Sequence, residues 1–337
     1  MPADAEWQIG GAALAPSLPQ IVAGPFLLPS ADGVSALEIA CVAKNKPAAD
    51  GSSYELIVRR FEPGKEMRTQ SFPLSERLAG TPGVAADHLV LPLADGRFVR
   101  QPFLGALQSG LSWRSAETDP SSHGQVAVLG PQEFLTTDGF RGLSRWQWPT
   151  AGPKLDPTLE KSFELGAGAG AIVGPPLVLP NATLACVADS KGSLFLVRTN
   201  DLKLVRRWEL KGPIATAPFL RGDHIGCVVG GRRLVWLDPN RDQLAWQYES
   251  PGAGIVGHPQ LSKGLVIVAD LSGQLVALDP ANGRPAGPDY RLAKGAIPAA
   301  APVSFGADKL FAPVTDGSVL LPPIEQLRSP TATASKP

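Results

Sequence analysis

The fold is decided by the stretch Gly264-Leu265-Val266-Ile267-Val268-Ala269-Asp270, followed by Gly273-Gln274-Leu275-Val276-Ala277-Leu278-Asp279-Pro280. Its two short apolar runs are separated by a turn that ends in glycine, which is typical of an antiparallel hairpin. A second copy of the pattern lies at 217–246 and closes on Trp246. Copies recur about every forty to fifty residues, and such a period indicates one supersecondary unit repeated along the chain.

Counting the copies predicts the architecture. Six copies are marked by the glycine of their central hairpin, at Gly96, Gly142, Gly192, Gly231, Gly273 and Gly317, and a seventh begins at Gly24. Seven copies in 337 residues give about 45 residues each, the length of a four-stranded propeller blade. The sequence therefore predicts an all-β fold, a seven-bladed β-propeller of four-stranded antiparallel blades.

The two ends of the chain predict how the ring closes. Most copies finish with an aromatic fourth strand, but the last stops near Leu321 without one. We expect residues 6–10, Glu6-Trp7-Gln8-Ile9-Gly10, to supply that strand, because an unpaired sheet edge invites aggregation. The prediction is one propeller domain over 1–327 and a disordered polar tail over 328–337. Short helices are expected near 74–78 and 324–327.

Composition excludes several partners. The 31 basic and 31 acidic side chains cancel, so neither nucleic acid nor an anionic membrane is expected as a partner. No run of eighteen apolar residues is present, so no membrane span is expected. The first residues lack the basic and apolar regions of a signal peptide. The expected location is therefore cytoplasmic, or the chain is a domain of a longer protein.

Three cysteines occupy matching positions in their copies. Cys41, Cys186 and Cys227 stand where the copy quoted first has Ile267. A position that accepts Cys or Ile is a buried strand position. We expect three reduced, buried thiols in separate blades and no disulfide.

The core Gly-x-Leu-x-Ala-Leu-Asp at 273–279, followed by a turn and an aromatic residue, resembles the repeat of pyrroloquinoline-quinone (PQQ)-type propellers. That family includes quinone-dependent alcohol dehydrogenases and an outer-membrane assembly lipoprotein. The resemblance is clear over 170–320 and implies the architecture rather than the chemistry. The dehydrogenases use a vicinal Cys-Cys pair and a calcium site of Glu, Asn and Asp, and neither pattern occurs in this sequence. We therefore expect no cofactor and no enzymatic activity.

Candidate ligand-binding residues gather on the predicted face that carries the hairpins between the second and third strands. His258 precedes the first strand of its blade, which is expected to line the central channel, so it is placed at the channel mouth. Packing or solvation at the channel mouth competes with a ligand-binding role for His258. The other candidates are the charged hairpin residues Arg232, Arg233, Asp95, Asp189, Asp270 and Asp316. The Asp-Gly turn is itself a preferred hairpin, so turn chemistry competes with a cation-binding role. His88, His123 and His224 are interpreted as solvated turn residues.

Two classes of function remain open. One is a non-catalytic scaffold, or an interaction domain of a longer chain, that binds a protein or peptide partner through this face and its loops. The alternative is a small-molecule binder or quinone-dependent oxidoreductase that uses the channel mouth near His258. The repeat pattern predicts the fold and does not identify a partner.

Overall fold

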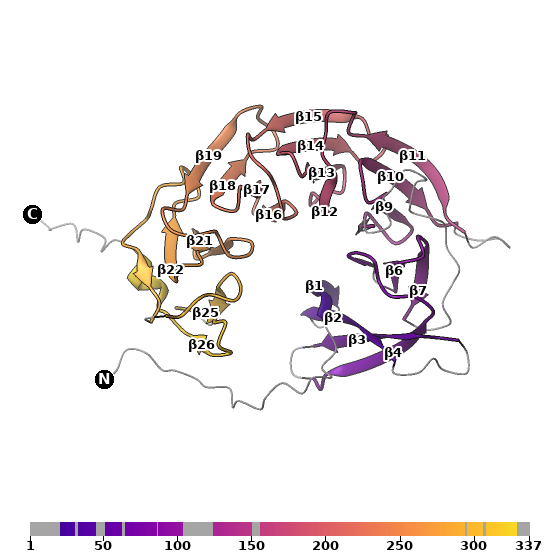
Figure 1. Cartoon of the computed structure of the whole chain (residues 1–337), viewed down its shortest axis with the longest axis horizontal. Coiled ribbons are helices and arrows are strands. Elements are labelled where there is room, and N and C mark those ends of the chain that lie inside the picture. Colours follow the sequence, from indigo (N-terminus) through magenta and orange to yellow (C-terminus); the bar gives the residue numbers. More distant parts are fainter. Residues whose placement is uncertain are drawn as a thin grey trace, which may run out of the picture. The chain divides into compact units, whose positions relative to one another are not determined.

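A computed structural model describes residues 21–30, 33–44, 51–62, 65–85, 87–103, 124–149, 156–293, 295–305 and 308–328. Within these ranges the chain forms seven sheets in which neighbouring strands are mostly consecutive in sequence (Figure 1). One short 3₁₀-helix, η1 (Ile324–Leu327), is the only helix of the described residues. The all-β prediction is confirmed. The chain divides into two compact units, with a boundary between Arg207 and Trp208.

The N-terminal unit holds most of four sheets. Their strands are β1 (Ile21–Ser30), β2 (Gly33–Ala43), β3 (Tyr54–Phe61) and β4 (Arg68–Leu74); β5 (Gly83–Val84), β6 (His88–Pro92) and β7 (Phe98–Pro102); β8 (Val126–Val128), β9 (Glu133–Thr137), β10 (Gly142–Gln147) and β11 (Thr158–Glu164); β12 (Ile172–Val178), β13 (Leu184–Asp189), β14 (Ser193–Arg198) and β15 (Leu204–Glu209).

The C-terminal unit holds the other three sheets. Their strands are β16 (Phe219–Arg221), β17 (His224–Val229), β18 (Arg233–Leu237) and β19 (Leu244–Glu249); β20 (Gln260–Ser262), β21 (Leu265–Ala269), β22 (Gln274–Leu278) and β23 (Tyr290–Arg291); β24 (Val303–Phe305), β25 (Lys309–Pro313) and β26 (Val319–Leu320). The hairpin that decided the fold pairs as expected, with Val266 opposite Leu278 and Ala269 opposite Leu275.

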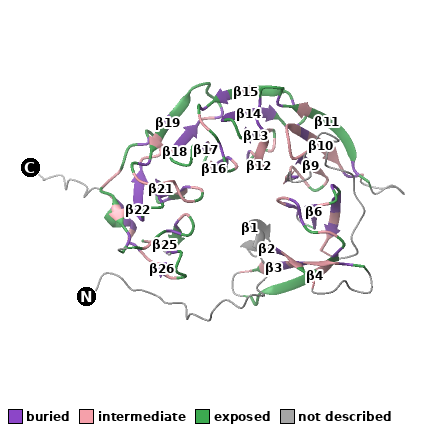
Figure 2. Ribbon diagram, in the orientation of Figure 1, coloured by how far each residue is buried: buried purple, intermediate pink, exposed green. Residues whose placement is uncertain are grey.

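The burial pattern explains why β21 and β22, the second and third strands of their copy, are almost wholly apolar. Every residue of β21 and β22 is buried, because each face of the sheet packs on a neighbouring layer. Outer strands such as β11 and β19 alternate or lie open to solvent, which Figure 2 shows in green. Trp236 of one sheet and Val266 of the next belong to the same buried cluster. The core therefore lies between consecutive sheets rather than within any one.

Four connectors between sheets are fixed to the sheet that follows them. A connector residue forms a β-bridge with a residue at, or one position beyond, the end of the next second strand. The bridged pairs are fifteen or sixteen residues apart: Leu78 with Leu93, Ile214 with Val229, Ile255 with Asp270 and Pro298 with Val314. We call this contact the connector bridge.

Several expectations about short segments need correction or stay open. No helix forms at 74–78: Leu74 ends β4 and Leu78 forms a connector bridge. The helix at 324–327 is present as η1, and its Ile324 and Leu327 are buried. Arg328 was assigned to the tail, but its Nη2 donates a 2.7 Å hydrogen bond to the Lys263 carbonyl. The closing strand at 6–10 and residues 329–337 lie outside the described residues.

The cysteines lie on the second strands, as the alignment predicts, but only two are buried. Cys186 of β13 and Cys227 of β17 are buried, and Cys41 of β2 is half-buried. All three are free thiols. The expectation of a buried thiol is therefore wrong for Cys41.

Candidate functional site

The carboxylates of Asp189 and Asp270 are used to hold their own hairpins. Asp189 Oδ1 accepts hydrogen bonds from the backbone N–H groups of Lys191 (3.0 Å) and Ser193 (2.8 Å). Asp270 Oδ1 accepts from Ser272 (2.9 Å) and Gln274 (3.1 Å) in the same way. Both side chains are almost fully buried, at 0% and 2% exposure. Buried carboxylates need such partners, and here the backbone N–H groups of the hairpin replace the hydrogen bonds to water that burial removes.

The second oxygen of each buried aspartate contacts the connector that approaches the hairpin. Asp189 Oδ2 accepts from the Gly170 N–H at 3.1 Å, and Asp270 Oδ2 accepts from the Ser250 hydroxyl at 3.0 Å. These carboxylates therefore fasten hairpin and connector together within each unit.

Asp95 and Asp316 are less enclosed. Asp95 accepts from the Arg97 N–H at 3.1 Å and pairs with the Arg97 guanidinium, whose Nη2 lies 2.6 Å away. Asp316 accepts from the Ser318 N–H at 2.8 Å. Hydrogen bonds from Ser318 hold the pKa of Asp316 below its ordinary value. No group of three or more His, Cys, Asp or Glu side chains suited to a metal ion occurs in the described part of the chain.

The two arginines of the β17–β18 turn bind backbone carbonyls. Arg232 Nη2 donates to the Ser250 carbonyl at 3.1 Å. Since Ser250 also bonds to Asp270, the connector joins the Arg232 hairpin to the Asp270 hairpin. Arg233 donates from Nη2 to the carbonyls of Leu210 and Lys211, the latter at 3.1 Å. Arg232 and Asp270 therefore belong to one network through Ser250, whereas Arg233 binds a different connector. Asp95 and Asp189 lie in the N-terminal unit.

His258 makes no hydrogen bond to this network through its ring. The imidazole is half-buried and stacks on the Phe219 ring, with centroids 4.8 Å apart and planes 21° apart. Burial lowers the pKa of His258, and the positive charge of Arg221 lowers it further. The His258 ring thus packs on an aromatic surface beside β16.

Arg221 is the neighbour that sequence reasoning did not identify. It ends β16, and its guanidinium lies 5.2 Å from the Phe219 ring centroid. Nε donates to the Pro259 carbonyl (2.9 Å) and Nη1 to the Leu220 carbonyl (2.7 Å). Burial lowers the pKa of this half-buried guanidinium. The corresponding first strand of the following copy, β20, ends in Ser262 instead. An arginine at the end of a first strand is therefore the sequence feature that could have indicated this site.

An aromatic stack also contacts Phe219. Trp236 meets Phe219 edge to face at 6.2 Å and stacks on Trp246 at 5.0 Å. Phe219 also covers Gly226, its partner across the β16–β17 pair, where a Cβ would lie 2.3 Å from the ring. Phe219 is therefore confined, and it presents the face on which His258 rests.

The interpretation of His88 as a solvated turn residue is wrong. His88 begins β6 and is 2% exposed. Its Nδ1 lies 2.7 Å from Asp87 Oδ1 and 3.2 Å from Arg100 Nη2, so a proton on Nδ1 can serve the carboxylate but excludes the arginine bond. Burial, followed by the charge of Arg100, lowers its pKa against the opposing effect of Asp87.

His224 and His123 are the other two histidines. His224 begins β17 and is half-buried, and its ring stacks on Trp236 with centroids 6.2 Å apart. It is therefore a strand residue on the aromatic stack rather than a turn residue in solvent. His123 lies outside the described residues.

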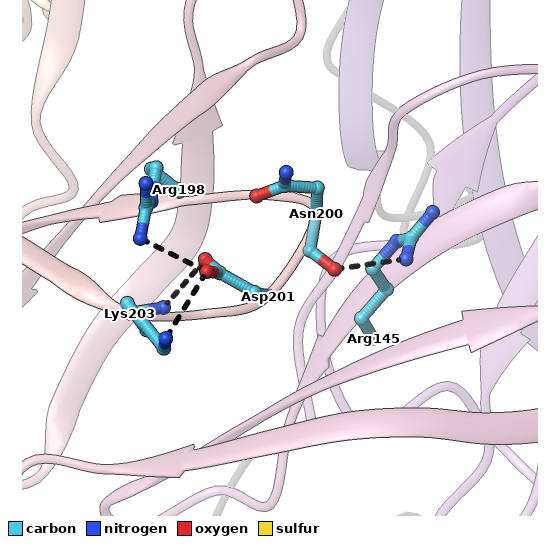
Figure 3. Close-up of polar contacts among 5 residues, drawn as sticks. All are labelled: Arg145, Arg198, Asn200, Asp201 and Lys203. Carbon is cyan, nitrogen blue, oxygen red and sulfur yellow. Dashed lines mark hydrogen bonds and ion pairs between the residues drawn. The ribbon is translucent and has the colours of Figure 1, made fainter.

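The turn between β14 and β15 is held by local charged contacts. Asp201 accepts from Arg198 Nη2 at 2.9 Å and from the Lys203 N–H at 3.1 Å (Figure 3). Arg145 of β10 donates to the Asn200 carbonyl at 3.1 Å and so ties two consecutive sheets (Figure 3). These contacts are exposed, and pairs of this kind contribute little to stability.

One pocket of about 590 Å³ lies in the N-terminal unit over β3 and β4. It is lined by Leu37, Val58, Arg60, Arg68, Thr69, Gln70 and Phe103. Its polar side chains include no acid, and Gln70 Nε2 reaches the Phe103 carbonyl only at 3.4 Å. Sequence reasoning did not identify this pocket.

A family model identifies the group of proteins to which this chain is related. Residues 104–289 match the family model described as outer membrane protein assembly factor BamB, which is more than half of the chain. The chain belongs to the BamB family. This identifies it as a PQQ-like repeat β-propeller, as the sequence pattern predicts. Comparison with curated proteins gives no match.

Solved structures share the fold of this BamB-family chain at low sequence identity. BamB from Moraxella catarrhalis is 12% identical with a TM-score of 0.57, and the match covers 88% of this chain and 81% of that one. The C-terminal WD40 domain of Sif2 is 11% identical with a TM-score of 0.59 and coverages of 85% and 82%. The computationally designed Ika8 protein is 13% identical with a TM-score of 0.56 and coverages of 88% and 94%. At these identities the likeness establishes the fold alone.

Proposed function

We propose that this chain is a non-catalytic scaffold that binds a protein partner through the hairpin face of its C-terminal unit. We define the hairpin face as the turns at 229–233, 270–274 and 314–318 together with the connectors at 211–215, 250–257 and 295–299. In this proposal the scaffold has seven blades, and residues 6–10 complete the last. The family description, an outer membrane protein assembly factor, supports a role in bringing proteins together.

The observation that carries the proposal is a pair of exposed apolar side chains on two neighbouring turns. Leu271 and Ile297 are 51% and 40% exposed. The turns that bear them touch, because Gly273 approaches the Ala296 carbonyl so closely that a Cβ would lie 2.5 Å from it. Apolar side chains on a rigid surface are typical of protein-binding sites.

The surrounding turns are held in place by hydrogen bonds, so the face is formed before any partner arrives. The Leu271 N–H donates to the Gly254 carbonyl at 2.9 Å, and the Thr315 N–H donates to the Ile297 carbonyl at 2.9 Å. A preformed surface loses little conformational entropy on binding. Arg232 lies on the same face and adds an exposed positive charge.

The test compares capture of protein partners by the wild-type chain and by Leu271→Asp/Ile297→Asp. A charge on these side chains should abolish capture of whichever protein mass spectrometry identifies with the wild type. Leu244→Asp is the matched control, because Leu244 is an exposed leucine (38%) on outer strand β19 of the same unit. Equal capture by the double variant and the control would refute the proposed face.

The non-catalytic part of the proposal has its own measurement. We expect no saturable rise in melting temperature when PQQ and Ca²⁺ are titrated together into the chain, because a bound cofactor stabilises the folded state by mass action. The sequence lacks the adjacent cysteines of the quinone dehydrogenases. A saturable rise of several degrees would instead support an enzyme.

A further inference from the structure

We propose that Arg221, with His258 and Phe219 beside it, binds a carboxylate of the protein partner. The inference rests on the proposed scaffold function and names the chemistry that one part of the partner must present. It concerns a site on strands β16 and β20, which belong to consecutive sheets of the C-terminal unit.

The first step is that Arg221 is held in one position. Two of its nitrogens donate to the carbonyls of Pro259 and Leu220, and the Phe219 ring packs against the guanidinium. A guanidinium on an aromatic face gains a favourable cation–π contact. Because these contacts fix the guanidinium before a ligand arrives, little side-chain entropy of Arg221 is lost on binding.

The second step is that these contacts leave the charge uncompensated. Both acceptors are neutral backbone carbonyls, and no carboxylate pairs with Arg221 in the described part of the chain. Its Nη2 has no hydrogen-bond partner among the described residues. Protonation of the neighbouring His258 would add positive charge rather than compensate it. An external anion can therefore pair with the accessible part of this half-buried guanidinium.

The third step selects a carboxylate with an apolar neighbour. Nη2 can donate charge-assisted hydrogen bonds to a carboxylate oxygen. The adjoining surface is aromatic at His258 and Phe219, and Leu261, two residues beyond Pro259 in the chain, is 42% exposed. An acidic side chain or a C-terminal carboxylate next to an apolar residue fits both properties. Free phosphate fits the charge only.

The probes are three matched tetrapeptides titrated into the full chain. The first is N-acetyl-Ala-Glu-Phe-Ala-amide, and the second replaces Glu with Gln. The third is the Gln peptide with a free C-terminal carboxylate. Inorganic phosphate is titrated separately. Binding is followed by the NMR signal of the His258 ring, assigned with His258→Asn.

We expect saturable shifts with one or both carboxylate peptides and none with the Gln amide. Arg221→Met keeps most of the aliphatic stem and should weaken binding by roughly tenfold or more, the usual effect of losing a charged hydrogen bond. Arg241→Met is the matched control and should bind within about twofold of wild type, since Arg241 is an exposed arginine paired with Asp238 at 3.1 Å.

Four results would overturn the proposal: equal binding of the Gln amide, unchanged affinity of Arg221→Met, no binding of any peptide, or saturation by phosphate at lower concentration than by peptide. Thermal melting checks that each variant folds. If Arg221→Met does not fold, Arg221→Lys replaces it and should weaken binding several-fold, because one ammonium cannot keep both carbonyl bonds and reach the ligand. Capture of the same partner by wild type and Arg221→Met, with loss in Leu271→Asp/Ile297→Asp, would leave the scaffold standing and remove this site.

Discussion

At the scale of single residues, two histidines lose protons more readily in the folded chain than in the unfolded one. Burial lowers the pKa of both His88 and His258 from an ordinary value of about 6.5. Below that value the unfolded chain binds more protons than the folded chain, so stability rises with pH in this window. Their contribution is complete above about 6.5 and is lost as pH falls through the folded-state values.

This difference predicts acid sensitivity. The free energy of unfolding, measured with urea, should fall between about pH 6.5 and 5, and the fall should be smaller in His88→Asn. Between about pH 7.5 and 8.5 neither histidine changes charge, so the two proteins should show parallel values there. An identical acid response of variant and wild type would show that His88 is not the group responsible.

The thiols provide a second residue-scale prediction. Burial raises the pKa of Cys227 to about 12 and also raises that of half-buried Cys41. Thiolates are the reactive form, and a bulky reagent needs access. Cys41 should therefore be labelled first in the native state, while Cys186 and Cys227 react only in denaturant, as intact mass spectrometry can count. Rapid labelling of all three without denaturant would contradict the buried strands.

The cysteines, His88 and Arg221 show which residue environments could be predicted from the sequence pattern and which could not. Cys186 and Cys227 were placed by alignment with Ile267, because burial on a strand follows from local periodicity. His88 was misplaced because its surroundings come from Arg100, on the next strand, and cannot be read from the adjacent Asp87 alone. Arg221 escaped notice for the same reason: one of its partner carbonyls belongs to Pro259, which immediately precedes β20 of another sheet.

At the scale of elements, the β16–β17 pair depends on a residue without a side chain. Gly226→Ala would place a methyl group 2.3 Å from the Phe219 ring, which is already confined by Trp236 and His258. Overpacking of this kind costs about 1–3 kcal/mol. Urea unfolding should show that loss, and the His258 NMR signal should shift with the displaced ring.

Gly168→Ala is the control for this substitution. No atom lies within 4 Å of its Cβ position, and its backbone is not in the left-handed region. Its effect should stay within about 0.5 kcal/mol, as for most surface changes. A Gly226→Ala variant as stable as this control would mean that Phe219 moves freely.

Elements were predicted best where apolar runs are long. The hairpin of β21 and β22 follows directly from its sequence, because both faces are buried. The helix expected at 74–78 was wrong because a short segment lacks the length to show a helical period, and Leu78 instead pairs with Leu93. Short connectors take their shape from the sheets they touch.

At the scale of the whole molecule, the last sheet has three described strands, so β26 forms its edge. If residues 6–10 complete it, deleting residues 1–10 should lower the melting temperature by several degrees, because a strand edge and apolar surface become exposed. Truncation after Arg328 removes a comparable length of chain and should leave the melting temperature unchanged. A deletion of 1–10 without effect would argue against the closing strand.

The connector bridges have a consequence for how such a chain changes over generations. Ile214 and Ile255 are separated by 41 positions, and so are their partners Val229 and Asp270. A genetic crossover between these equivalent points would insert or remove a full period, and every bridge at the junction would still find a partner. A crossover at unequal points would leave a connector without its acceptor. Only crossovers that add or remove a whole period keep every connector bridge. The number of repeats can therefore change by whole periods while the sequence of each copy diverges.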